Sequence, residues 1–307
     1  YENYDEPAYV WQSSSADSDF EPKLSLMPLL MGTLKGTLYA MLFAVPIAVL
    51  AALYASQFMS ARLRGVIKPS VEIMAAVPSV VVGFLAGLWL APLLEHAIPG
   101  IMCSLFMLPL CLMVAVVGYR QVRHLAGWER IENGLEFLVL IPIVVLAIYA
   151  AVQLGAALEH AVFSGDFKQW LYDHFKLRVD QRNSIVIAFA LGFTVIPIIF
   201  TLSDDALAAV PRNLTAASLA LGASRWQTGW RVVLPSASPG IFAAIMIGLG
   251  RAVGETMIVL MATGNTPIME WSIFNGMRTL AANIAVEIPE APHHGTLYRT
   301  LFLSAVL

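Results

Sequence analysis

Residues 30–55 read LMGTLKGTLYAMLFAVPIAVLAALYA and contain one charged side chain, Lys35. About 20 consecutive apolar residues are enough for a helix to cross the hydrocarbon core of a bilayer. Lys35 lies near the outer end of the run, where a long basic side chain is expected to reach the interface by snorkelling. The stretch therefore predicts a membrane-spanning helix.

Six further apolar runs follow along the chain, at about 72–94, 98–118, 135–158, 184–202, 238–262 and 296–307. The composition agrees, with 58% hydrophobic and 13% charged residues, whereas a soluble domain carries roughly 25% charged residues. A formal net charge of −3 also argues against a nucleic-acid partner. We expect an all-α membrane protein, a polytopic bundle of about seven transmembrane helices.

Charge predicts how the chain divides and how it is oriented. Residues 1–27 are polar and acidic and are expected to form an extramembrane, periplasmic-side segment, followed by a transmembrane domain over residues 28–307. The segments 56–71, 119–134 and 203–237 hold nine basic residues, whereas the alternate loops hold six. Because cytoplasmic loops are enriched in Lys and Arg, the N-terminal end is predicted outside and the C-terminal end inside.

Three Gly-x-x-x-Gly spacings lie in or beside the apolar runs: Gly32/Gly36, Gly83/Gly87 and Gly250/Gly254. Small residues four apart allow helices to approach closely in lipid. The pattern also arises by chance in glycine-rich helices, so both interpretations stay open for each pair.

The loop 203–235 has the pattern of two short helices. Pro211 suits the first turn of a helix, and Gly222 suits the left-handed residue that ends one. One face of this first helix is apolar: Leu214, Ala217 and Leu221. Ser224 and Gln227 have the spacing of a capping box that starts the second helix, and Pro235 is expected to close it.

The same loop resembles the cytoplasmic loop of ABC importer permeases: Glu-Ala-Ala, three residues, Gly, nine residues, Ile-x-Leu-Pro. This chain has Ala216-Ala217-Ser218, then Gly222 and Val232-Val233-Leu234-Pro235 at the same spacing. In that family the loop forms coupling helices that dock on an ATPase subunit. The resemblance implies a coupling role for Ala216, Ala217, Ser218, Leu221, Gly222, Leu234 and Pro235. Ala216 replaces the family's usual glutamate, which leaves docking to shape and apolar contact.

Two other stretches are similar to phosphate-specific permeases of the PstC type. They are residues 75–81 (AAVPSVV) and 248–257 (GLGRAVGETM). The resemblance implies the ABC type I importer permease fold, with residues 96–183 as an inserted helix pair and polar outer loop. It also implies a bacterial inner-membrane transporter for phosphate with four kinds of component: this permease, a second permease subunit forming a heterodimer, two ATP-binding subunits and an external phosphate-binding protein.

Arg251 and Glu255 are two charges inside the run 238–262, and they would share one face of a continuous helix. A charge at mid-membrane costs on the order of 3 kcal/mol, so it needs a partner or a function. A guanidinium matches two oxygens of a tetrahedral anion. Glu255 would accept the O–H hydrogen of hydrogen phosphate, which sulfate lacks. The alternative is a structural pair that neutralises itself.

Three more residues complete the predicted substrate path: Thr256, Pro78 and Ser79. Thr256 follows Glu255 directly in the stretch similar to phosphate permeases. Pro78 and Ser79 are expected to break the second helix beside the path, the alternative being a plain kink.

No chemical motif in the sequence indicates an enzyme. It has no Gly-x-x-x-x-Gly-Lys-Ser/Thr phosphate loop, so ATP hydrolysis is expected in a separate subunit. No cofactor and no metal site is expected. Two alternatives to phosphate transport stay open: a permease for another oxyanion such as sulfate or molybdate, and a membrane sensor or scaffold that does not transport.

Overall fold

The computed structural model describes residues 7–15, 20–123, 136–163 and 165–307. The first half contains two short strands and the helices up to α6. Its elements are β1 (Trp11–Gln12), β2 (Lys23–Leu24), α1 (Met27–Gln57), α2 (Ala61–Ala75), α3 (Ser79–Leu85), the π-helical turn η1 (Ala86–Leu90), α4 (Ala91–Arg123), α5 (Glu136–Val162) and α6 (Phe167–Phe175).

The second half is also helical. Its elements are α7 (Ser184–Ala208), α8 (Arg212–Ala220), α9 (Arg225–Thr228), the π-helical turn η3 (Gly229–Val233), α10 (Leu234–Val253), α11 (Met257–Ala262), α12 (Leu280–Glu287), the 3-10 turn η4 (Ile288–Glu290) and α13 (Thr296–Val306). The prediction of an all-α membrane protein is confirmed.

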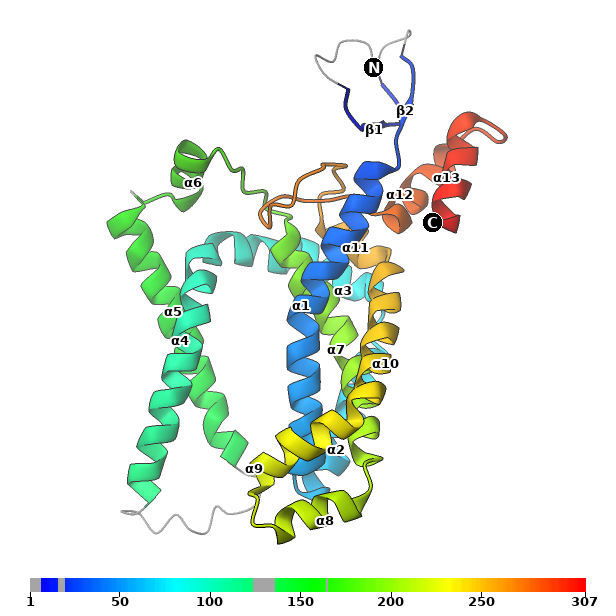
Figure 1. The fold of residues 1–307 in the computed structure, drawn as a ribbon. Helices are drawn as coiled ribbons and strands as arrows, with labels where there is room; N and C mark the ends of the chain where they lie inside the picture. Colours follow the sequence, from blue (N-terminus) through cyan, green and yellow to red (C-terminus); the bar gives the residue numbers. More distant parts are fainter. Residues whose placement is uncertain (1–6, 16–19, 124–135, 164) are drawn as a thin grey trace.

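Within the described residues, five helices are long and apolar enough to cross a membrane. Three match single predicted runs: Met27–Gln57, Ile141–Val162 and Ser184–Ala208. The predicted runs 72–94 and 98–118 share one helical stretch, Ser79–Ala115. In Figure 1 this stretch reverses direction in the half of the bundle that holds α6 and α12. The run 238–262 divides at Gly254, where α10 ends, and α13 has 11 residues.

The centre of the bundle is the contact between α1 and α7, the most extensive between any two elements. Alanines recur every four residues along the buried face of α1: Ala40, Ala44, Ala48 and Ala52. They allow the larger buried residues of α7, such as Ile187, Leu191 and Val195, to pack closely against the α1 backbone. α10 packs against both α7 and α1, and its Gly248 meets Ile199 of α7.

The predicted inserted helix pair is the hairpin of α4 and α5, which lies beside the rest of the bundle (Figure 1). The two helices cross at glycines, with Gly155 against the backbone at Gly100. Around the crossing they expose large apolar side chains, including Phe106 and Leu146, as expected for a surface in contact with lipid. At the end of the hairpin next to α6, Lys168 of α6 pairs with Glu95 of α4.

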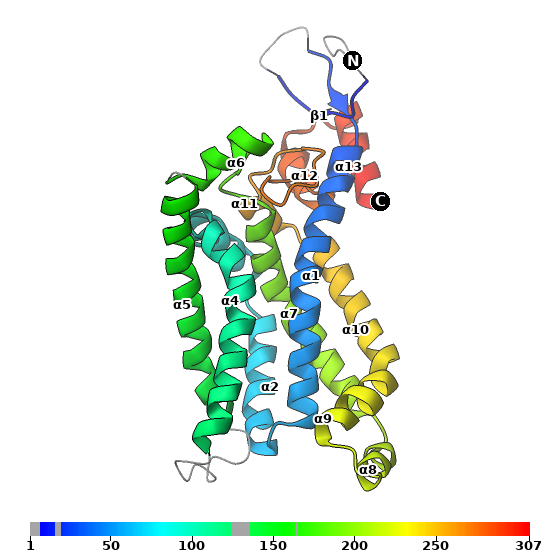
Figure 2. The same ribbon diagram turned by 60° about the vertical axis from the view of Figure 1, so that its left-hand side comes forward.

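The two ends of the bundle are clearly different. The strands, α6, α12 and α13 lie at one end, and α8 and α9 lie at the other (Figures 1 and 2). Leu307, the last residue of the sequence, lies in the half of the bundle that holds the strands (Figure 1). The side of the membrane on which each end lies stays a prediction.

Some predictions fall outside the described residues. The basic loop 119–134 includes Arg130, which lies in the undescribed segment 124–135. In the segment 1–27, Trp11 and Gln12 of β1 pair with Lys23 and Leu24 of β2, and Trp11 is buried.

We predict that Gly155→Ala destabilises the protein, whereas Gly65→Ala does not. A Cβ at position 155 would collide with the backbone at Gly100, and overpacking costs about 1–3 kcal/mol. Gly65 lies on α2 with no atom within 4 Å of its Cβ position, so alanine there gains up to about 1 kcal/mol of helix propensity. Thermal denaturation in detergent, followed by size-exclusion chromatography, measures both; equal midpoints would contradict the crossing.

Candidate functional site

The helix α8 projects from the bundle without burying any of its own residues. Leu214, Ala217 and Leu221, the predicted apolar face, are all exposed, and Leu221 is 89% exposed. Together these side chains form a small apolar surface at this end of the molecule.

The turn after α8 has the predicted geometry. Gly222 has a φ of +88°, a conformation that glycine adopts without strain. The capping box is also confirmed, since the Gln227 amide donates to Ser224 Oγ at 3.2 Å and the Ser224 amide donates to Gln227 Oε1 at 2.8 Å. The hydroxyls of Ser218 and Thr228 lie 2.9 Å apart and link the two short helices.

The prediction that Pro235 closes the second short helix is wrong. The chain continues helically from α9 through η3 into α10, and Leu234 and Pro235 form the first turn of α10. Proline is tolerated there because its missing N–H falls within a first turn. α9 and α10 are nonetheless inclined to each other in Figure 1, so α9 lies across the end of the bundle. Its Trp226 stacks on Trp230, with ring centroids 5.7 Å apart.

Arg251 and Glu255 do not share a helical face, and that prediction is wrong. α10 ends at Val253, and Gly254 separates the two charged residues. Glu255 is buried, and its Oε1 accepts hydrogen bonds from the amides of Met257 (3.2 Å) and Ile258 (3.4 Å) at the start of α11. A carboxylate is favourable at that position because the first amides of a helix lack partners.

Arg251 is exposed on the last turn of α10. Among the described residues, its guanidinium forms no ion pair and no hydrogen bond, so the alternative of a self-neutralised pair with Glu255 is not what the structure shows. The surrounding exposed face of α10 is apolar or small, with Ile247, Gly250 and Gly254. A cation in an apolar membrane segment is costly unless a partner or water reaches it.

The predicted break at Pro78 and Ser79 is present. α2 ends at Ala75, Pro78 has an extended ψ of 127°, and Ser79 begins α3. α3 packs on α11, since a Cβ at Gly83 would lie 2.9 Å from the Met257 carbonyl oxygen. The break and the Glu255 cap therefore belong to adjoining segments, with Thr256 between Glu255 and α11.

The glycine pairs have different environments. Gly83 and Gly87 both contact the α11 backbone, and Gly32 and Gly36 contact the segment at Met277 and Arg278. Gly250 meets nothing within 4 Å, and Gly254 meets only its own helix. Two of the three pairs are therefore packing contacts within this chain, and the third lies on the exposed face beside Arg251.

Sequence reasoning missed two charged clusters. Lys35 does not snorkel: it is 1% exposed, and its Nζ lies 3.5 Å from the Asn275 carbonyl oxygen. Near it, Arg278 donates to Glu287 Oε1 at 2.9 Å. Burial lowers the pKa of the Arg278 guanidinium, and Glu287 opposes this effect. The Lys35 contact joins α1 to the segment 263–287, whereas the Arg278–Glu287 pair lies within that segment.

The second missed cluster joins α2 to α7 at the opposite end, where Asp204 is buried against Arg64. The apolar run was predicted to stop at residue 202, which placed Asp204 in a loop, whereas α7 continues to Ala208. The sequence contained one signal for this cluster, namely the adjacent acidic pair Asp204-Asp205 directly after an apolar run. The basic segment 56–71, which contains Arg64, was the other half of that signal.

A comparison with known protein families shows which family matches this chain. The family described as "Binding-protein-dependent transport system inner membrane component" matches residues 130–307, which include α8, the turn at Gly222 and Arg251. The chain belongs to this family. It is accordingly a multi-pass inner-membrane protein of a transport family.

Individual relatives are similar over part of the chain. It is 33% identical over 201 residues to phosphate transport system permease protein PstC 1 of Mycobacterium tuberculosis, covering 62% of this chain and 58% of that protein. It is 33% identical over 128 residues to the probable ABC transporter permease protein YqgH of Bacillus subtilis, covering 42% and 41%. Similarity to the permease PstA 1 of M. tuberculosis is 35% over 118 residues, covering 38% and 39%. The chain thus spans about two fifths to three fifths of these relatives.

We predict that Gly222→Val disrupts the α8–α9 turn, whereas Gly222→Asn preserves it. Both substitutions add a side chain in open space, but a left-handed φ costs a β-branched residue roughly 1–2 kcal/mol more than it costs asparagine. Hydrogen exchange of the amides over 212–228 measures the effect. Valine should accelerate exchange by about tenfold, and equal rates in the two variants would show that the turn does not depend on the left-handed residue.

Proposed function

We propose that this chain is the membrane-spanning permease subunit of an ABC importer that moves inorganic phosphate across the bacterial inner membrane. The observation that carries the proposal is Arg251, an exposed guanidinium on the last turn of an apolar membrane helix that has no partner among the residues the structure describes. A planar guanidinium is suited to two oxygens of a tetrahedral anion. The similarity to a phosphate permease over 201 residues supports phosphate as that anion.

Glu255, which lies beyond the end of α10 and does not share a helical face with Arg251, would give the path a second property. Its Oε1 is occupied by the α11 amides, and no hydrogen bond to Oε2 occurs within the described part of the chain. This oxygen can accept a hydrogen bond from the O–H group of hydrogen phosphate, whereas sulfate has no O–H group to donate one. A buried acceptor left without a donor discriminates strongly against the wrong ligand. A path must also release its ion, so weak binding is expected there.

Because Arg251 and the exposed glycines lie on the outer face of α10, the anion would pass between this chain and another. A second permease subunit forming a heterodimer would complete the path, and Pro78 and Ser79 would line it from the α2–α3 break. An external phosphate-binding protein would deliver the ion to the end that holds the strands and α12. This orientation places α8 in the cytoplasm.

A separate ATPase would supply the energy, with two ATP-binding subunits for the two permeases. The loop 203–235 fits the docking role, because α8 has no buried residue and presents Leu221 at its tip. Ala217 and Leu221 give it a small apolar surface, and Ala216 adds no charge there. Movement of this surface would switch access to the path between the two sides of the membrane.

We predict that Arg251→Ala lowers phosphate uptake by at least about tenfold, as expected when a charge-assisted contact to the ion is lost. The measurement is uptake into liposomes that hold the full-length protein with its partners. Arg299→Ala, which removes an exposed arginine from α13, is the matched control and should retain uptake. Equal uptake in all three proteins would remove Arg251 from the path.

Glu255→Gln tests the choice of anion in the same assay. The amide oxygen can still accept the α11 amides, so the fold is retained, but the charge is lost. We expect the preference for phosphate over sulfate to fall by at least about tenfold. An unchanged preference would leave another oxyanion, or a non-transporting protein, as the better interpretation.

We predict that Leu221→Asp prevents the ATPase subunits from co-purifying with the permease. A carboxylate at the tip of α8 would have to be desolvated on docking. Ile288→Asp adds the same charge at an exposed position on the opposite end and should retain the ATPase. Loss of the ATPase in both variants would indicate a general effect of charge.

A further inference from the structure

The helix α2 lies against the bundle without burying a single residue of its own. Its principal neighbour is α7. A shallow groove of about 470 Å³ borders it on the side of Met59 and Pro69, so packing does not enclose it there. On α2, Val71 packs against the hydrophobic core but no residue of the helix is fully buried, so apolar contact alone attaches this helix only weakly.

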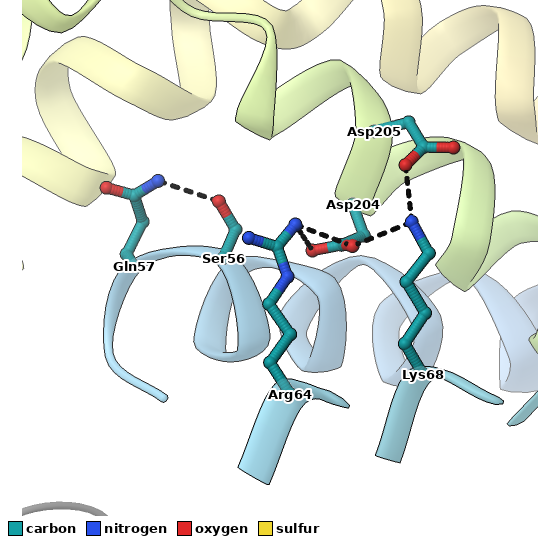
Figure 3. Close-up of polar contacts among 6 residues, drawn as sticks. All are labelled: Ser56, Gln57, Arg64, Lys68, Asp204 and Asp205. Atoms are coloured by element: carbon teal, nitrogen blue, oxygen red, sulfur yellow. Dashed lines mark hydrogen bonds and ion pairs between the residues drawn. The ribbon is translucent and has the colours of Figure 1, made fainter. Parts of the chain in front are cut away.

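Charge supplies the missing attachment (Figure 3). Asp204 of α7 has a side chain that is 0% exposed. Arg64 Nη2 donates to both of its carboxylate oxygens, at 2.9 and 2.8 Å, and Lys68 Nζ lies 3.4 Å from Oδ2. Arg64 and Lys68 stand one helical turn apart on α2, so both reach the same carboxylate.

Asp205 provides an internal contrast. It is 60% exposed and pairs with Lys68 at 2.5 Å. Its hydrogen bond raises the pKa of Lys68 above the usual value, and Asp204 adds to this effect. A solvated pair of this kind contributes little. In contrast, a carboxylate excluded from water must remain paired, so separating α2 from Asp204 is strongly unfavourable.

The cluster stands between the proposed docking surface of α8 and the predicted path. On one side, Asp204 lies in the last turns of α7, and only residues 209–211 separate α7 from α8. On the other side, α2 leads to the break at Pro78 and then to α3, whose Gly83 contacts the start of α11 behind Glu255. A continuous series of contacts thus connects α8 to the Glu255 cap.

We propose that Asp204 is a positioning residue for transport. Its ion pair with Arg64 makes α2 follow the α7–α8 corner, so that displacement of α8 by the ATPase reaches the α2–α3 break and the site at Glu255. The inference rests on the proposed function, because that function defines what is transported. The Asp204–Arg64 ion pair, in contrast, lies entirely within this chain. Asp204 does not touch the transported ion and acts through α2.

The first test measures phosphate transported per ATP hydrolysed by the reconstituted full complex. Asp204→Asn and Arg64→Gln should each lower this ratio by about tenfold while ATP hydrolysis continues, and the double variant should be no worse than either single one, because all three remove one interaction. Asp205→Asn is the matched control and should leave the ratio unchanged. Arg64→Lys, which keeps the charge, should restore most of it.

Two results would overturn the inference. One is a ratio for Asp204→Asn equal to that for Asp205→Asn. The other is a parallel loss of uptake and ATP hydrolysis in Arg64→Gln, which would indicate a purely structural role. Arg64→Gln keeps the test decisive if Asp204→Asn does not fold, because Lys68 still faces the carboxylate in that variant.

A second test does not depend on the transported ion. Spin labels on exposed positions of α2 and α8, at Ile73 and Asn213, report their separation in the complex trapped with ATP and vanadate, after Cys103 and Cys111 are replaced by serine. The separation should stay constant through the cycle in the parent and in Asp205→Asn, and should change in Asp204→Asn. A changed separation in Asp204→Asn would support the inference even if phosphate is not the substrate. A constant separation in Asp204→Asn would contradict the inference without contradicting the proposed function.

Discussion

Close approach of helix backbones is the constraint on which this structure depends. Lipid provides no hydrophobic drive for apolar helices to associate, so they adhere through packing, and packing improves where side chains are small. The alanine face of α1 against α7 builds the centre of the bundle. Gly83 and Gly87 seat α3 on α11, and Gly100 with Gly155 closes the α4–α5 crossing. Each of these contacts holds two helical segments together without a polar side chain.

Against this background, each buried charge has a specific neighbour. Asp204 faces Arg64 and Lys68, and Glu255 faces the first amides of α11. Arg251 is different, because its guanidinium is exposed and unpaired among the described residues. In an apolar bundle a paired charge fixes two elements to each other, whereas an unpaired charge is available to a ligand. This difference separates the proposed positioning residue from the proposed anion site.

The two ends of the molecule follow the same division. The end with α8 exposes apolar side chains without covering them and holds an ionic contact directly behind them. The opposite end is tied together by Lys35, Arg278 and Glu287 beneath the strands. One end thus presents an uncovered apolar surface, and the other attaches the segment 263–287 to α1.

The sequence by itself determined the membrane spans Met27–Gln57, Ile141–Val162 and Ser184–Ala208, the turn at Gly222 and the Ser224–Gln227 capping box, because each depends on hydrophobic length or on contacts a few residues apart. Only the tertiary structure decided where α10 ends, and with it that Arg251 and Glu255 part at Gly254 rather than share a face. It also decided that Lys35 is buried and that Asp204 meets Arg64, 140 positions away along the chain. Pairing between distant charges depends on how helices are arranged in space, and local periodicity carries no information about that arrangement.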